Sequence, residues 1–314
     1  MKITLIHNPG AGDGQDVMAL VRLITDAGHD LRYRSTKQDW KELLRKPADL
    51  VVAAGGDGTV RRVALEAAAR CLPFSAIPLG TANNIAKTVG LLGEAADLIE
   101  TWSPSPGAEH PFDLGEVDAP WGTKRFVEGV GAGLVADLIE REDEIAADAK
   151  LLGRATDRAL HLLSVLVREE PVRRWKIRAD GRDLTGDYFS VEVLNTRFVG
   201  PNLPLAEKAF PGDGLLDVVL LRAADREPLH SYLESRLHLA SGRMPKLKTV
   251  RASEIEIGAP AGIRWHLDDH NWPSAEPVAE KSTLTVRCLA GALKFVAAEA
   301  SFSDSPQAKR PADA

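Results

Sequence analysis

A buried strand that runs directly into a glycine-rich turn is the feature that most restricts the fold of this chain. Residues 48–54, ADLVVAA, are apolar at successive positions, which is typical of a strand buried on both faces. The loop GGDGT, residues 55–59, follows at once, and apolar residues at helical spacing begin at Val60. Glycines allow a tight turn, and the amides at the start of a helix favour an anion. This segment therefore predicts a strand–loop–helix corner that binds an anionic group.

Strands and helices alternate through the first third of the sequence. The pattern predicts strands at residues 2–7, 30–35, 48–54 and 74–79, with helices at 16–29, at 39–46 and after residue 57. Such alternation indicates a parallel, doubly wound α/β sheet with ligands at the carboxyl ends of its strands.

A second pattern begins at Phe112, where short strands are separated by turns and the step Asp180-Gly181 is typical of a hairpin. This part predicts an antiparallel β-sandwich or barrel with helical segments at 134–169 and 228–241. We expect an α/β domain over residues 1–111, with a return near 290–298, and a sandwich domain over 112–289. The tail, residues 301–314, is polar and is expected to be disordered.

Composition narrows the class of protein. The net charge of −6 argues against a nucleic-acid binder, which normally carries a basic surface. The only two cysteines, Cys71 and Cys288, form no metal-binding or disulfide pattern, so a reducing cytoplasm is expected. No segment has the length and apolar character of a membrane span.

A second glycine corner resembles the first. Gly80 and Thr81 follow the strand at 74–79, and a helix is expected to open at Asn83. The first loop lacks the Gly-Lys-Ser/Thr of a Walker motif, and Asp57 would repel a polyphosphate unless a cation lay between them, so Mg²⁺ is expected there. The alternative is that each corner is an ordinary glycine turn.

The paired loops GGDGTVRRV and PLGTANNIAKTVGL, together with FDLGEV, GDGLLDV and WHLDDHNWP further on, resemble the diacylglycerol kinase catalytic-domain family, a family of bacterial lipid kinases related to sphingosine and ceramide kinases. The resemblance covers residues 2–298. It implies an ATP-dependent, Mg²⁺-dependent transfer of the γ-phosphate to a hydroxyl of diacylglycerol or a related lipid, with ATP and lipid meeting in a cleft between the two domains.

The resemblance also implies site residues. Those expected to contact ATP are Asn8, Thr36, Gly55, Gly56, Asp57, Gly58, Thr59, Thr81 and Asn84. Asp213, acting with the carbonyls of Phe210 and Leu215, resembles a structural Mg²⁺ site. Asp268 matches an aspartate that accepts the proton of the lipid hydroxyl, which is what phosphoryl transfer needs from a base.

The sequence departs from the family at three positions where acidic residues are usual: Arg62, Asn84 and His270. His270 is read as a substitute proton acceptor, or as a side chain that pairs with Asp268 or Asp269. A zinc site with His266 is disfavoured because that spacing suits a helix and this segment reads as strand and turn.

Two other functions stay open: an NAD kinase, which shares the GGDGT loop, and a nucleotide- or lipid-binding protein with degraded catalysis. We expect a lipid substrate at a membrane surface, with residues 151–174 either lying on that surface or packing on the sandwich. A homodimer is kept as an alternative to a monomer.

Overall fold

The computed structural model describes residues 1–12, 17–102, 108–147, 155–274 and 276–298. The chain folds into two compact units. Unit 1 contains Met1–Leu114, Phe210–Gly214 and the chain from Leu289, and unit 2 contains Gly115–Ala209 and Leu215–Cys288. The predicted disordered tail at 301–314 lies outside the described residues.

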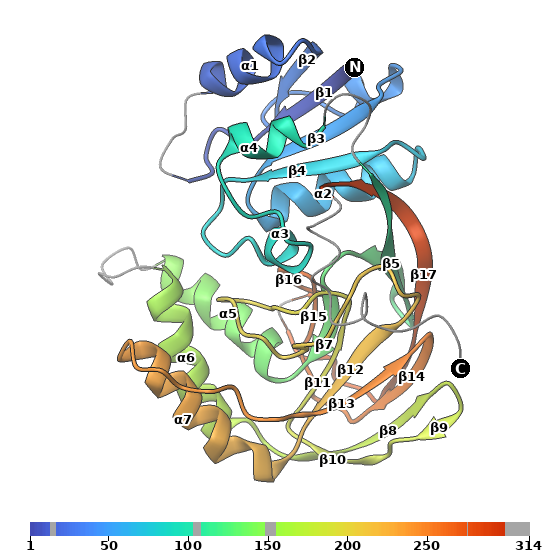
Figure 1. The fold of residues 1–314 in the computed structure, drawn as a ribbon. Coiled ribbons are helices and arrows are strands. Elements are labelled where there is room, and N and C mark those ends of the chain that lie inside the picture. The colour runs from blue at the N-terminus through green and yellow to red at the C-terminus, as the bar shows by residue number, and fades with distance from the viewer. Residues whose placement is uncertain (13–16, 103–107, 148–154, 275, 299–314) are drawn as a thin grey trace, which may run out of the picture. The chain divides into compact units, whose positions relative to one another are not determined.

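Unit 1 is built on a parallel sheet with the strand order β17-β4-β3-β1-β2 (Figure 1). Its strands are β1 (Lys2–His7), β2 (Asp30–Ser35), β3 (Leu50–Gly55), β4 (Phe74–Pro78) and the end of β17 (Ser282–Val296). Its helices are α1 (Val17–Asp26), η1 (Leu43–Arg45), α2 (Asp57–Ala68), α3 (Asn84–Thr88) and α4 (Ala95–Glu100).

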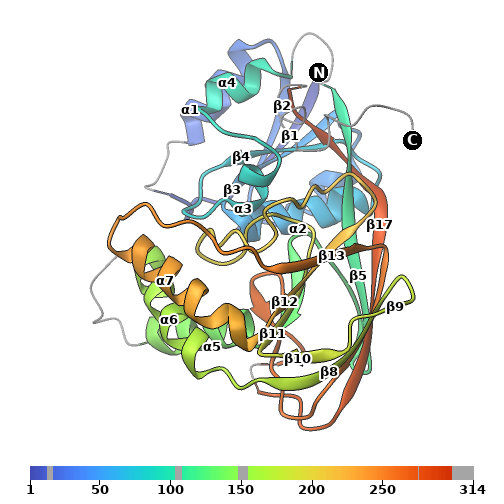
Figure 2. The ribbon, with the colours of Figure 1, turned by 60° about the horizontal axis from the view of Figure 1, so that its bottom comes forward.

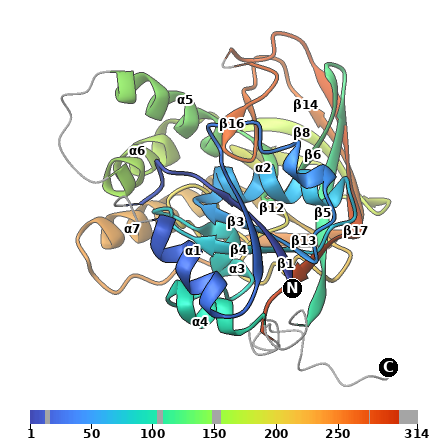
Figure 3. The same ribbon diagram turned by 90° about the horizontal axis from the view of Figure 1, so that it is seen from above.

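Helices cover both faces of this sheet. Helices α1 and α4 lie next to each other (Figure 3) and pack Leu20, Ile24 and Ile99 against Leu5 and other residues of one core cluster. Helix α2 buries the apolar residues predicted to face inward, which are Val60, Val63, Ala64 and Ala67. Every residue of β3 is buried, so the predicted doubly covered strand is confirmed.

Unit 2 is an antiparallel sandwich. One sheet has the order β10-β8-β14-β17, with β5, β6 and β9 attached, and the other has the order β13-β12-β11-β7-β15-β16. The strands of the first sheet are β5 (Glu109–Ala119, which begins in unit 1), β6 (Gly122–Phe126), β8 (Arg173–Ala179), β9 (Arg182–Asp183), β10 (Gly186–Tyr188) and β14 (Glu254–Ala259). Those of the second are β7 (Gly129–Ala132), β11 (Ser190–Leu194), β12 (Leu216–Leu221), β13 (Lys248–Ala252), β15 (Trp265–Leu267) and β16 (His270–Asn271).

One core lies between the sheets and a second lies under helices. Trp175 of β8 and Trp265 of β15 meet edge-to-face across the first core, with ring centroids 6.1 Å apart. Helices α5 (Leu134–Ala147), α6 (Ala155–Glu169) and α7 (Arg226–Leu237), with the short η2 (Ala223–Asp225), lie beside the second sheet (Figure 2). They pack on its other face, where Val219 and Leu221 of β12 point. The structure confirms an α/β unit joined to an antiparallel β unit.

Several predicted elements differ in detail. The helix expected at 39–46 is only the three-residue η1. The segment 134–169 contains two helices, α5 and α6. The apolar side of α6 is buried against α5, α7 and β12, so Leu160, Leu163 and Val167 pack on the sandwich instead of facing a membrane. Leu151, Leu152 and Arg154 lie outside the described residues. No helix in the described ranges is long and apolar enough to span a membrane.

Candidate functional site

The two glycine corners of unit 1 are in direct backbone contact. Each follows one of the adjacent parallel strands β3 and β4, so both loops come out at the same edge of the sheet. A Cβ atom on Gly80 would lie 2.5 Å from the Cα of Gly56, and one on Gly56 would lie 3.3 Å from the Cα of Gly80. Because a side chain at Gly80 would collide with backbone, glycine is required there for the loops to approach.

Asp57 links the two corners through its side chain. It is the first residue of α2, and its Oδ1 accepts a hydrogen bond of 3.0 Å from the amide of Ile85 in the first turn of α3. Burial raises the pKa of Asp57, while the amides of residues 83–85 and the charge of Lys87 act in the opposite direction. The negative charge of Asp57, which would repel a phosphate, is therefore partly balanced by the amides and the lysine of the second glycine corner.

Asn83 shapes the second corner and was missed in the sequence. It has a φ of +52°, its Oδ1 accepts from the Gly80 amide at 2.9 Å, and its Nδ2 donates to the Gly80 carbonyl at 2.6 Å. Asparagine tolerates this left-handed conformation, which is the signal that could have identified it. Thr81 is exposed beside this turn, and Asn84 is buried at the start of α3.

The ends of β1 and β2 bring Asn8 and Thr36 to the same edge of the sheet. The Thr36 hydroxyl lies 3.5 Å from Oδ1 of Asn8, and the Asn8 amide donates to Ala54 at the end of β3. Gly12, with a φ of +64°, has space for no side chain because the carbonyl oxygen of Leu79 would lie 2.6 Å from its Cβ. The predicted ATP contacts of unit 1 are thus gathered along one edge.

The amide-rich turn before α2 is suited to a polyphosphate. The first amides of a helix have no partner within the helix and point out of its N-terminus. Because positions 55, 56 and 58 are glycine, Asp57 carries the only side chain between Gly55 and Gly58. Arg62, one of the departures from the family pattern, donates its Nε to the Gly58 carbonyl at 3.1 Å and so adds positive charge near the turn.

The segment that carries Asp213 is held by Asp113. The Asp113 carboxylate is buried and accepts from the amides of Gly214 at 2.8 Å and Gly291 at 2.7 Å, which fixes the loop Phe210–Gly214 in unit 1. Asp213 and the carbonyl of Phe210 supply oxygen donors of the kind that Mg²⁺ or Ca²⁺ takes. Within the described ranges no group of three or more His, Cys, Asp or Glu side chains could hold a metal, so a cation here would depend on backbone carbonyls.

In unit 2, Asp268 lies in the turn between β15 and β16 with a φ of +52°. Its Oδ1 accepts from the amides of Glu128 at 2.7 Å, Gly129 at 3.1 Å and Val127 at 3.2 Å, and the side chain is only 6% exposed. The carboxylate is therefore held rigidly by the loop between β6 and β7.

Three buried polar side chains, Ser190, Glu192 and His266, are linked by hydrogen bonds next to that turn. The sequence analysis did not predict this network. His266 has one ring nitrogen, Nε2, 2.7 Å from the Glu192 carboxylate and the other, Nδ1, 3.0 Å from the Asp268 carbonyl. Ser190 donates to the second oxygen of Glu192 at 2.9 Å. Burial disfavours the imidazolium, but the Glu192 carboxylate and the Asp268 carbonyl outweigh it, and the pKa of His266 is raised. The two neighbours make His266 a bridge between β11 and the turn of Asp268.

His270 lies at the surface, 43% exposed, with its Nδ1 3.4 Å from the carboxylate of Asp269. That contact agrees with the reading in which His270 pairs with a neighbouring aspartate. His266 is fully buried and already bonded on both ring nitrogens, so the pair does not form a zinc site.

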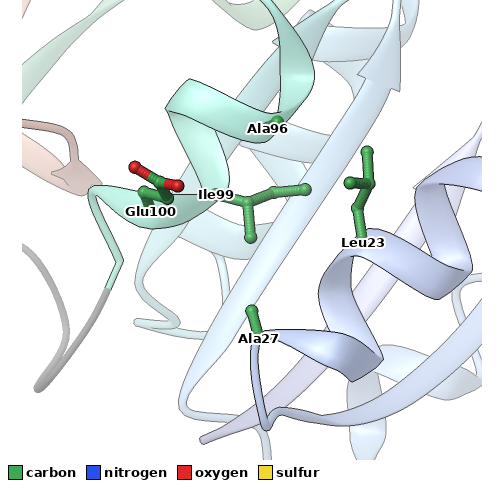
Figure 4. Close-up of a pocket in the computed structure, with 5 residues that line it drawn as sticks. All are labelled: Leu23, Ala27, Ala96, Ile99 and Glu100. Carbon is green, nitrogen blue, oxygen red and sulfur yellow. The ribbon is translucent and has the colours of Figure 1, made fainter.

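A hollow of about 380 Å³ opens between α1 and α4 in unit 1, lined by Leu23, Ala27, Ala96, Ile99 and Glu100 (Figure 4). Its one charged group, Glu100, would repel a phosphate. It shares no residue with the glycine loops, so the chemistry of the loops and not this hollow defines the candidate site.

Two family models match this chain, one over each of its two parts. Residues 2–117 match the family model for the diacylglycerol kinase catalytic domain, and residues 138–297 match that for the YegS C-terminal NAD kinase beta sandwich-like domain. The chain belongs to the diacylglycerol kinase catalytic-domain family.

Relatives of this diacylglycerol kinase family member match over most of their length. A protein of Pseudomonas aeruginosa named probable lipid kinase YegS-like is 29% identical over 277 residues, covering 85% of this chain and 86% of that protein. A Mycobacterium tuberculosis protein named diacylglycerol kinase is 24% identical, covering 85% and 88%. A crystal structure of a diacylglycerol kinase from Bacillus anthracis has a TM-score of 0.67 at 20% identity, covering 95% and 97% of the chains, which shows that the fold is shared.

Proposed function

We propose that this protein is an ATP-dependent lipid kinase that transfers the γ-phosphate to a hydroxyl of diacylglycerol or a related lipid. The observation that carries the proposal is the contact of the two glycine corners, joined by Asp57, in a chain of the diacylglycerol kinase family. This contact places the N-terminus of α2, with its unpaired amides, next to the turn at Gly80 and Thr81. This arrangement supports binding of a polyphosphate by amides, without a Walker lysine.

Unit 1 would hold the nucleotide. Gly55–Thr59 and Thr81 would donate to the phosphates, while Asn8 and Thr36 would contact the remainder of ATP and Asn84 would support the second turn. Asp57 has one carboxylate oxygen bonded to Ile85, and it would help to orient a Mg²⁺ ion. When bound, Mg²⁺ would neutralise charge on the phosphates during transfer. Asp213, with the carbonyls of Phe210 and Leu215, is proposed to hold a second, structural cation.

Unit 2 would supply the base. In the proposed step the lipid hydroxyl oxygen forms a bond to the γ-phosphorus, the bond between that phosphorus and the ADP oxygen breaks, and the hydroxyl proton passes to Asp268. Three amides hold the Asp268 carboxylate in one orientation, which suits a group that must point at the hydroxyl. His270 is 43% exposed and would assist as a secondary acceptor.

The test is a phosphorylation assay in which the purified protein, ATP and Mg²⁺ are given a panel of diacylglycerols, sphingoid bases and phosphatidylglycerol, with mass detection of the products. We expect one lipid class to gain a phosphate, and Asp57→Asn to abolish the gain while keeping its hydrogen bond to Ile85 and the thermal stability. If no lipid is phosphorylated, the proposal fails. Including NAD in the panel tests the NAD kinase alternative.

A second candidate function is nucleotide or lipid binding without turnover. It is favoured by the residues Arg62, Asn84 and His270, which stand where acidic residues are usual in the family. Tight binding of ATP with no product from any lipid, and no gain of activity in His270→Glu, would support this function over the kinase.

A further inference from the structure

The end of helix α7 has an unusual leucine. The helix closes with a Schellman motif, in which the amide of Ala240 donates to the Ser235 carbonyl at 2.8 Å and the amide of Leu239 donates to the Arg236 carbonyl at 3.2 Å. Leu239 therefore occupies the position after the C-cap His238, and its φ is +53°. Glycine is the usual residue there, because a side chain in the left-handed conformation costs free energy.

The side chain of Leu239 also gains nothing from packing. It is 96% exposed, the highest value among the large apolar side chains that the structure describes as exposed. Residues His238–Arg243 are all exposed around it. Leu239 is therefore unfavourable in two ways: its backbone is in the left-handed conformation, and its apolar side chain is exposed to water. No contact of that side chain within unit 2 offsets either effect. Contact with an apolar partner outside the protein would remove the leucine side chain from water, which is favourable.

Positive charge surrounds this leucine. From Arg236 to Lys248 the chain contains Arg236, Arg243, Lys246 and Lys248 and no acidic residue, although the whole protein has a net charge of −6. Arg243 and Lys246 are exposed. The closest acid along the chain, Glu234, lies on α7 within 3.8 Å of His230 and His238. The charge on this segment is thus the opposite of that of the protein as a whole.

The segment is held against the body of unit 2. Met244 and Leu247 are half-buried and pack on the core beneath α6 and α7. Gly242 lies so close to α7 that a Cβ atom on it would collide with the side chain of Ser235. Leu239 is therefore presented from a segment with fixed attachments on both sides, which limits the ordering cost of binding.

We propose that this segment, residues 236–248, docks the protein on an anionic membrane surface, with Leu239 entering the apolar boundary and Arg243 and Lys246 contacting lipid headgroups. Lysine and arginine side chains attract a negatively charged bilayer, and apolar area buried at its boundary adds to the binding. The choice of a lipid surface as partner rests on the proposed lipid kinase function; the contact itself needs neither ATP nor transfer.

The test is sedimentation of the full chain with vesicles of phosphatidylcholine, with and without phosphatidylglycerol, in the absence of nucleotide. We expect binding only with phosphatidylglycerol and weakening as salt rises. Leu239→Gly should bind about tenfold more weakly, the loss of one inserted leucine, while its melting temperature stays the same or rises because glycine suits the left-handed position. Arg243→Glu and Lys246→Glu should each weaken binding about fivefold or more.

Matched controls are Leu92→Ala, at a leucine of unit 1 that is 66% exposed, and Arg182→Glu, at an exposed arginine of β9. Both should bind as the wild type does. The proposal is overturned if Leu239→Gly keeps full vesicle binding, or if Leu239 instead mediates a dimer that sediments without vesicles and is lost in Leu239→Gly.

Activity separates this inference from the proposed function. Leu239→Gly should phosphorylate a detergent-dispersed lipid as the wild type does and lose activity only on lipid in vesicles. A protein that binds vesicles through this segment but phosphorylates no lipid would contradict the kinase proposal alone. A kinase with unchanged activity of Leu239→Gly on vesicles would contradict the docking proposal alone.

Discussion

At the scale of single residues, the two aspartates expected to carry the chemistry both accept hydrogen bonds from the backbone of another loop. Asp57 accepts from Ile85, and Asp268 accepts from three consecutive amides of residues 127–129. Each carboxylate thus fixes its own direction and also joins two loops. Sequence motifs predicted a role for both residues. Their hydrogen bonds, however, join residues that are 28 and about 140 positions apart along the chain, so no local sequence pattern predicts these bonds.

The partners of these aspartates were harder to foresee. Glu192 and His266 come from two separate strands, each of which reads as an ordinary apolar run, and only the pairing of β7 with both β11 and β15 brings them together. Gly131 on β7 lies between them, where a Cβ atom would lie 1.8 Å from a Glu192 oxygen. An acid and a histidine that meet across an intervening strand are therefore recognisable as partners only once the sheet order is known.

We predict that Glu192→Gln destabilises unit 2 by about 3 kcal/mol, since removing one member of a buried pair leaves the other uncompensated. Burial lowers the pKa of His266, but Glu192 and Asp268 raise it above 6.5 overall. A raised folded pKa gives stability that is fully present below the unfolded pKa and is lost as the pH rises through the folded value. The gap between wild type and variant should therefore narrow as the pH rises above 6.5.

The measurement is urea unfolding of both proteins at several pH values from 6 upward. Ser190→Ala is the control, because it removes a bond to Glu192 and keeps the charge pair. A gap that does not change with pH would contradict the assignment of charge to His266.

At the scale of elements, local patterns were sufficient wherever a strand or turn is defined by its own residues. The bounds of β1 and β2 agree with the predicted strands, and the hairpin at Asp180-Gly181 has a positive φ at both positions, +45° and +76°. Prediction failed where a distant group interrupts a run. Residues 249–259 contain no glycine or proline before Gly258, so the sequence alone shows no break there. In the structure Asp180 accepts hydrogen bonds from the amides of Ser253 and Glu254, and the chain passes at that point from β13 in one sheet to β14 in the other.

The contact between the glycine corners leads to a prediction about elements. Gly80→Ala would press a methyl group against the Cα of Gly56, so we expect a destabilisation of about 1–3 kcal/mol and loss of nucleotide binding as the loops move apart. Gly10→Ala is the matched control for stability, since the nearest atom to its Cβ would be Oδ1 of Asn8 at 3.6 Å, and its effect should be within about 0.5 kcal/mol.

Thermal unfolding and ATP titration calorimetry of the two variants provide the measurement. Equal stability of Gly80→Ala and the wild type would mean that the corners do not need their close approach. Normal ATP binding by a destabilised Gly80→Ala would mean that the nucleotide does not depend on the loop pair.

At the scale of the whole molecule, stability should depend on pH through one buried carboxyl. Burial, a hydrogen bond that protonated Glu170 donates to the Asp137 carboxylate, and the negative charge of Asp137 together raise the pKa of Glu170 to about 8. Its surroundings are otherwise cationic, because Arg226 donates to the carbonyls of Val167 and Arg168 and of Glu170 itself. In the folded protein Glu170 therefore keeps its proton at neutral pH, where the unfolded chain releases it.

A carboxyl whose pKa is raised on folding favours the folded state at low pH, and this contribution declines as the pH rises from about 4.5 to about 8. We predict that the free energy of unfolding falls across this window by up to about 5 kcal/mol and that Glu170→Gln removes most of the fall. Melting temperatures measured in steps of pH test this. A wild type and variant with parallel pH profiles would contradict it.

The strand β17 has a consequence for how the protein is made. Its first residues pair with β14 in unit 2, and Phe295 near its end pairs with Phe74 of β4 in unit 1. During synthesis Phe74 of β4 therefore has no partner in β17 until nearly 300 residues have been translated. An open strand edge is a site of association with other chains, so a fragment that ends before β17 would tend to aggregate through β4.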